Sequence, residues 1–91
     1  MRFEWDEEKA LENAKKHRVS FEQAQKVFND PRAVPFEDLE HSTTDETRYV
    51  MIGMSSLGLL FVSFTYRDDT VRLILARRAE KWMVKVYEDK K

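Results

Sequence analysis

Four arginines of the C-terminal quarter are the residues whose type and spacing most clearly suggest a chemistry. They are Arg67, Arg72, Arg77 and Arg78. An arginine keeps its positive charge and presents its N–H groups in a planar fork that fits phosphate oxygens. Two of the four lie where a predicted strand passes into the last predicted helix, whose first backbone N–H groups also favour an anion. The sequence therefore predicts a phosphate site at this junction, with a solvated surface balanced by nearby acidic residues as the alternative.

Two arginines inside predicted strands extend this cationic set. Arg48 and Arg72 interrupt otherwise apolar stretches, and a charge on the covered face of a sheet is costly unless it is paired. We therefore expect both on the solvated face, where a substrate or a partner protein can reach them. Glu46 and Arg48 are two residues apart, so their side chains point to the same side of a strand. Such a pair can act as a base beside a phosphate clamp, or it can be only a surface ion pair.

The two histidines have different expected roles. His17 falls at the end of the first predicted helix and titrates near neutrality, so it can serve as an acid or a base. The alternative is a cation that interacts with the negative end of the helix dipole. His41 lies in a polar loop, where we expect a bystander. The chain has no cysteine and its histidines have no ligand spacing, so we expect no metal and no cofactor.

Length and composition limit the classes of protein to which the chain can belong. The 91 residues suffice for one domain, 1–91, and contain no apolar run of the roughly 20 residues that span a bilayer. The N-terminus turns acidic at once and has no apolar signal core, so we expect no membrane association and a cytoplasmic protein. The net charge is −1, but residues 67–91 carry eight Lys and Arg against five Asp and Glu. A phosphate-bearing partner can therefore dock at the C-terminal quarter although the whole chain is not basic.

Capping signals predict two N-terminal helices. Asp6 is a good N-cap for a helix over 7–16. Ser20 and Gln23 have the spacing of a capping box, and apolar residues at helical spacing follow until the segment before Pro31. These helices precede a region of different periodicity.

Alternating and β-branched residues then predict strands. The ranges are 33–36, 47–54, 59–66 and 70–76, the last three joined by connections of hairpin length into an antiparallel meander. From Ala79 the apolar residues Trp82, Met83 and Val86 return to helical spacing. We expect Trp82, like Trp5, to lie in the core. The predicted fold class is α+β: two N-terminal helices, an antiparallel sheet meander, and a C-terminal helix covering the sheet with the others.

The ordered set of residues along the whole chain resembles the BrnT family of toxins. In the N-terminal half the matching residues are Phe3-Glu4-Trp5-Asp6, Lys9, Asn13, Lys16-His17, Val19-Ser20-Phe21, Ala24 and Phe28-Asn29-Asp30-Pro31. In the C-terminal half they are Glu46, Arg48, Ile52-Gly53, Ala76-Arg77-Arg78-Ala79 and Tyr87-Glu88. Two positions depart from the family pattern. Arg18 stands where glycine is usual, and Leu75 stands where a small polar residue often occurs.

The resemblance implies a compact fold similar to RelE-type ribonucleases, toxicity through RNA cleavage, and neutralisation by a cognate ribbon–helix–helix antitoxin of the BrnA kind. Since such an antitoxin is itself a dimer, we expect a toxin–antitoxin heterotetramer. Metal-free RNA cleavage uses the 2′-hydroxyl as nucleophile and needs a base, an acid and fixed positive charge. We expect the catalytic residues to be His17, Glu46, Arg48 and Arg77. The residues expected to bind RNA are Lys9, Lys16, Arg72, Arg78 and Lys81.

The predicted function is therefore a toxin that inhibits growth and translation by metal-independent endonucleolytic cleavage of RNA. The alternative is a non-catalytic module that binds a protein partner through the sheet face or the last helix. A DNA-binding repressor fits less well, because the last helix is too apolar to be a recognition helix. Serine hydrolase chemistry is excluded, since no base or oxyanion signature surrounds the serines.

Overall fold

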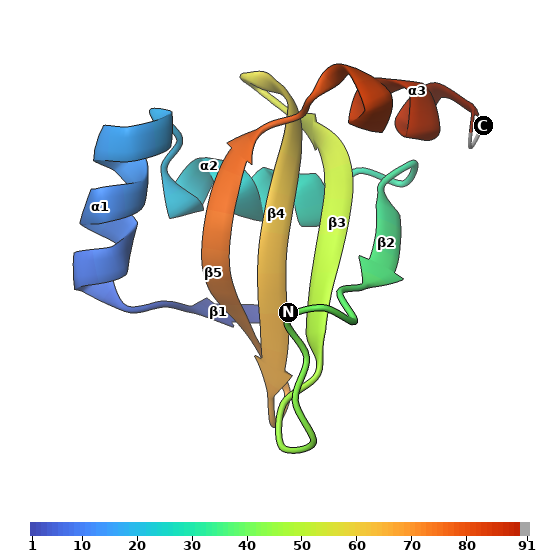
Figure 1. Ribbon diagram of the computed structural model, residues 1–91. Helices are drawn as coiled ribbons and strands as arrows, with labels where there is room; N and C mark the ends of the chain where they lie inside the picture. The colour runs from blue at the N-terminus through green and yellow to red at the C-terminus, as the bar shows by residue number, and fades with distance from the viewer. Residues whose placement is uncertain (90–91) are drawn as a thin grey trace.

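The computed structural model describes residues 1–89 and contains a five-stranded sheet in the order β1-β5-β4-β3-β2 (Figure 1). The strands are β1 (Arg2–Glu4), β2 (Val34–Glu37), β3 (Arg48–Ser55), β4 (Gly58–Arg67) and β5 (Thr70–Arg78). The meander of the three long strands is confirmed, and β2 adds to it antiparallel. β1 pairs with β5 in parallel, so the sheet is mixed and not wholly antiparallel as predicted. The α+β class predicted from the sequence is confirmed.

Helical segments at both ends of the chain accompany the sheet. They are α1 (Glu7–His17), α2 (Phe21–Gln25), the 3₁₀ segment η1 (Lys26–Asn29) and α3 (Lys81–Asp89). In Figure 1, α2 crosses behind the long strands, whereas α1 lies beyond β5 and α3 lies at the upper end of the sheet. Buried apolar side chains of α2, η1 and the strands form the core between them. This core contains Val19, Phe21, Ala24, Val27, Leu60, Val62, Phe64, Val71, Leu73 and Ala76.

Both predicted helix starts are confirmed by their caps. The Asp6 carboxylate accepts from the backbone N–H groups of Glu8 and Lys9 at 2.9 and 3.2 Å. The Ser20 hydroxyl accepts from the Gln23 backbone at 3.0 Å, and the Gln23 side chain accepts from the Ser20 backbone at 2.9 Å, which completes a capping box. These caps satisfy N–H groups that the first turn of a helix leaves without partners.

The last helix differs from the prediction in its start and in its buried face. It begins at Lys81 and not at Ala79, because the Ala79 backbone N–H still donates to Leu59 and continues the strand pairing. Only Met83 of the predicted apolar stripe is buried, whereas the Trp82 side chain is 54% exposed. The prediction of a core position was therefore wrong for Trp82. It is confirmed for Trp5, whose ring packs edge-on against Phe21 in the core.

One buried asparagine joins α1 to the sheet where β1 has ended. The Asn13 amide nitrogen donates to the carbonyl oxygens of Val19 and Ala76, each at 2.9 Å. Its amide oxygen accepts from the Ala76 backbone N–H at 3.1 Å. The side chain thus satisfies both backbone groups of one β5 residue, as a neighbouring strand does. α1 is held against β5 by this contact.

The conformation of Arg18 shows why glycine is usual at this position of the family. Arg18 is the C-cap of α1 and adopts a left-handed conformation, with φ 60° and ψ 33°. A residue with a Cβ atom pays roughly 1–2 kcal/mol in this region, which glycine enters freely. Glycine is therefore the favoured residue at such a helix end.

We expect Arg18→Gly to raise the free energy of unfolding by about 1 kcal/mol, because it removes this strain. For a chain of this size the melting temperature then rises by roughly 4–8 °C, measurable by calorimetry. Arg18→Ala is the matched control, since it removes the same side chain and keeps the Cβ atom. Equal melting temperatures for the two variants would contradict the strain argument.

Candidate active site

The strand register brings three arginines onto the face of the sheet that is turned away from the core. On β4, Leu60, Val62 and Phe64 point into the core, so the alternate residues Phe61 and Thr65 point to this open face. Thr65 pairs with Arg48 on one side and with Arg72 on the other, and Phe61 pairs with Arg77. The expectation that Arg48 and Arg72 lie on the face opposite the core is thus in accord with the register.

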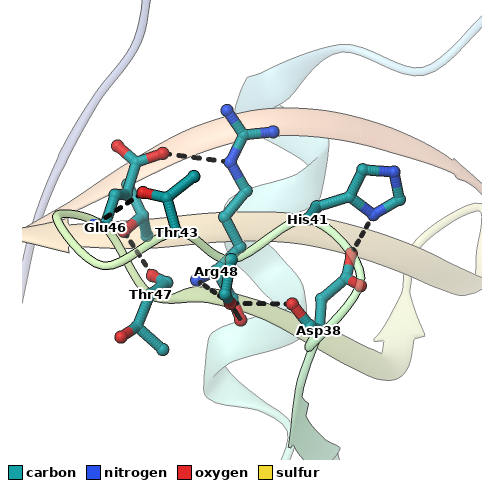
Figure 2. Close-up of polar contacts among 8 residues, drawn as sticks. Asp38, His41, Thr43, Glu46, Thr47 and Arg48 are labelled. Atoms are coloured by element: carbon teal, nitrogen blue, oxygen red, sulfur yellow. Dashed lines mark hydrogen bonds and ion pairs between the residues drawn. The ribbon is translucent and has the colours of Figure 1, made fainter.

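Each of the three arginines contacts one carboxylate. Arg72 pairs with Glu4 of β1 at 2.8 Å, and Arg77 pairs with Glu80 at 2.9 Å. The Arg48 Nε donates to the Glu46 carboxylate at 3.0 Å (Figure 2). A guanidinium has five N–H donors, so each arginine retains donors for a further anion. The carboxylates hold the cations in place without using up their capacity to bind phosphate.

Arg77 has a second contact that fixes its position. Its guanidinium carbon lies 4.3 Å from the centre of the Phe61 ring, a cation–π contact on the open face. Arg78 is the next residue of β5, so its side chain projects from the opposite face of the strand. The Arg78 side chain donates to the Leu57 carbonyl at 2.9 Å, in the turn between β3 and β4. The two neighbouring arginines thus do not lie together.

Three adjoining hollows surround Ile74, beside the β-bulge of β4 and β5. The first is lined by Asp6, Lys9, Glu46, Arg48, Thr65, Arg67, Arg72, Leu73 and Ile74. The second is lined by Lys9, Glu12, Asn13, Lys16, His17, Ile74 and Leu75. The third is lined by Asp38, His41, Arg48, Phe61, Ser63, Ile74, Leu75 and Arg77. We refer to the three together as the open-face groove.

The open-face groove collects most of the residues that the sequence singled out. Glu46, Arg48, Arg72, Arg77 and His17 all line it, as do Lys9 and Lys16 of α1. Arg78 is directed away from it, and Lys81 is an exposed residue at the start of α3 that lines none of the three hollows. Leu75, the second departure from the family pattern, forms part of the wall between two hollows.

His17 lies close enough to Arg77 to be affected by its charge. Partial burial, and then the positive charges of Lys16 and Arg77, lower the pKa of the His17 imidazole below its usual value. The shift favours the uncharged imidazole over the cation that the helix-end alternative requires.

The loop between β2 and β3 is held by a small hydrogen-bond network (Figure 2). The Asp38 backbone N–H donates to the Arg48 carbonyl at 2.8 Å. The Ser42 hydroxyl donates to the Asp38 carbonyl at 2.7 Å and accepts from the Arg48 backbone N–H at 2.9 Å. Nδ1 of His41 lies 2.8 Å from the Asp38 carboxylate. The loop is therefore ordered against the start of β3.

His41 and Asp38 line the groove although the sequence analysis did not predict either as a site residue. His41 was expected to be a bystander in a polar loop, but the loop folds back so that its imidazole lines the same hollow as Arg48 and Arg77. The available signal was its carboxylate partner three residues earlier. That signal is weak, because acidic and polar residues are common in loops.

The described residues contain neither a cluster of metal-ligating side chains nor a membrane-spanning helix. Among residues 1–89, no three His, Asp or Glu side chains lie together as the ligands of a metal ion would. In the same part of the chain, no helix has both the length and the apolar character required to span a bilayer.

Comparison with known protein families finds a match over most of the chain. A model of the family described as the ribonuclease toxin BrnT of type II toxin–antitoxin systems matches residues 5–82. None of the curated proteins compared with the chain matches it. The matched range contains α1, all of the long strands and every residue that lines the open-face groove. The chain therefore belongs to the BrnT family of ribonuclease toxins of type II toxin–antitoxin systems.

Proposed function

We propose that the protein cleaves RNA within the open-face groove by a metal-independent mechanism, and that this cleavage inhibits growth and translation in the cytoplasm. The observation that carries the proposal is the presence of Arg48, Arg72 and Arg77 on one face of the sheet, beside imidazole groups. The α+β order of the elements is compatible with the RelE-type ribonuclease fold, which we propose for this chain.

The reaction proposed is attack of a ribose 2′-oxygen on the adjacent phosphorus. Negative charge accumulates on the phosphate oxygens in the transition state, and pre-positioned guanidinium groups stabilise it there. Arg48 and Arg77 line one hollow, so both can contact the same phosphate. Arg72 and Lys9 line the adjoining hollow and are placed to bind the RNA backbone on one side of the reacting phosphate, as Lys16 is on another.

The groups that move protons are drawn from the groove. His17, whose pKa is lowered, and His41 are the two imidazole groups of the groove and therefore the candidates for the proton acceptor. Glu46 was expected either as a base beside Arg48 or as its ion-pair partner, and its carboxylate does accept from the Arg48 Nε. The role that this contact favours for Glu46 is to orient the arginine.

We expect RNA cleavage to continue unchanged in EDTA, because the proposed base and phosphate contacts are all protein side chains. The assay follows a free in vitro transcript by gel electrophoresis. A 2′-deoxy substitution at a mapped cleavage site is the control, and it should block cleavage there by removing the nucleophile. Loss of activity in EDTA that added Mg²⁺ or Mn²⁺ restores would refute metal independence.

A further inference from the structure

We propose that His41, oriented by Asp38, is the base that takes the proton from the 2′-hydroxyl. This inference rests on the proposed function, since it assigns a role within the same groove. It follows from four observations: the contact between the two side chains, their difference in exposure, the hollow that they line, and the attachment of their loop to Arg48.

The contact between the two side chains fixes which nitrogen of the imidazole can react. His41 Nδ1 lies 2.8 Å from an Asp38 carboxylate oxygen. An ionised carboxylate only accepts hydrogen bonds, so Nδ1 carries the hydrogen and Nε2 is the nitrogen that gains or loses a proton. An orienting carboxylate of this kind holds the ring in one tautomer and stabilises the imidazolium once it has formed.

The two side chains differ in exposure, and the one that has to reach the substrate is the more exposed. The Asp38 side chain is 20% exposed and the His41 side chain is 60% exposed. The carboxylate is thus the inner member of the pair, and the imidazole is the outer member that a substrate can reach. In Figure 2 the His41 ring and the Arg48 guanidinium project to the same side of the strands.

The hollow that contains His41 also contains the phosphate-binding arginines. It measures about 270 Å³, and His41, Asp38, Arg48 and Arg77 contribute to its lining. A phosphate bound between the two guanidinium groups is adjacent to the imidazole. His17, by contrast, lines the neighbouring hollow, which Ile74 and Leu75 separate from this one. His41 is therefore the imidazole that shares a hollow with both arginines.

The backbone links the imidazole pair directly to one of these arginines. Asp38 N–H donates to the Arg48 carbonyl at 2.8 Å, and the Ser42 hydroxyl joins the Asp38 carbonyl to the Arg48 N–H. Three short contacts therefore set the position of the base relative to a phosphate ligand. Such pre-organisation is required of catalytic groups.

Nε2 of His41 takes the 2′-hydroxyl proton while the 2′-oxygen forms a bond to phosphorus. The bond from phosphorus to the 5′-oxygen breaks, and the leaving oxygen takes a proton from water. The products are a 2′,3′-cyclic phosphate and a 5′-hydroxyl end. The imidazolium then returns its proton to water, so the protein is unchanged overall.

The test begins with His41→Ala in the full-length chain, with folding checked by circular dichroism and the melting temperature. General base catalysis contributes roughly 100- to 10,000-fold, so we expect the cleavage rate to fall by at least about 100-fold with RNA binding retained. Added imidazole should restore a measurable part of the rate, because the small molecule can occupy the vacated space and accept the proton.

Asp38 is tested as a positioning residue. Asp38→Asn should lower kcat without changing KM, because the amide can hold the ring in the wrong tautomer, and Asp38→Glu should recover part of the rate. Asp45→Asn is the matched control, since it removes a carboxylate from the same loop at an exposed position. Its rate should equal that of the parent protein.

The possible failures are distinguishable. If the parent protein cleaves neither the free transcript nor the RNA in a translation reaction, the proposed function itself is wrong. If the parent cleaves and folded His41→Ala cleaves at the same rate, the assignment of His41 is wrong. A rate lost together with RNA binding, and not restored by imidazole, would make His41 a binding residue and would also overturn the proposal.

Discussion

Replacing Arg77 with alanine is expected to lower the rate of RNA cleavage by roughly 100- to 1000-fold, and to abolish toxicity when the variant is expressed alone. Arg77 lines the same hollow as Arg48, and the Phe61 ring and the Glu80 carboxylate fix its guanidinium group. Its charge is therefore in place before a substrate binds, and removing it forfeits a transition-state contact worth about 3–4 kcal/mol. The measurements are single-turnover cleavage and growth after induction.

The controls separate charge from geometry and from folding. Arg77→Lys keeps the charge but loses the planar fork, so we expect an intermediate rate. Arg32→Ala removes an exposed arginine outside the groove and should leave the rate unchanged. A folded Arg77→Ala variant as toxic as the parent would remove Arg77 from the proposed site.

Stoichiometric antitoxin is expected to abolish RNA cleavage completely. Membership of a type II toxin–antitoxin family implies an antitoxin partner. We propose that the partner is a BrnA-like ribbon–helix–helix protein, that a heterotetramer forms, and that an acidic or amphipathic segment of the antitoxin occupies the open-face groove. The groove offers that segment the same arginines that we assign to RNA, so the two ligands exclude each other.

Complex formation should also stabilise the toxin. A ligand that binds only the native state adds roughly 2.7 kcal/mol when its free concentration is 100 times Kd. For a chain of this size, that corresponds to a rise in melting temperature of roughly 10–20 °C. Titration of the purified toxin with the protein encoded beside it measures both effects. Tight binding with undiminished cleavage would place the antitoxin somewhere other than the groove.

Local features of the sequence were sufficient to predict most of the elements. Asp6 and the Ser20–Gln23 capping box fixed two helix starts, because capping depends on residues within one turn. The long strands were predicted within two residues of their bounds from alternation and turn chemistry. The parallel pairing of β1 with β5 was not predictable in this way, because it joins segments almost seventy residues apart.

The residues of the candidate site, too, could be predicted from the sequence only in part. The position of Arg48 and Arg72 on the open face followed from the cost of burying a charge within an apolar strand. His41 was missed because its position depends on Ser42 and on backbone contacts with Arg48, which have no periodic signature. Trp82 was misplaced because its spacing is helical, but α3 covers only the end of the sheet and buries only Met83 among its residues from 81 to 89.

The contact between Asn13 and β5 has a consequence for how the sheet can associate with other chains. An edge strand exposes unpaired N–H and C=O groups, which favour aggregation or the addition of a strand from another protein. Where β1 stops, the Asn13 amide occupies the groups of Ala76 and blocks that edge. The opposite edge is β2, four residues long and interrupted by Pro35, which has no N–H to donate. Pairing with another main chain is therefore hindered along β2 and at the part of β5 that extends beyond β1.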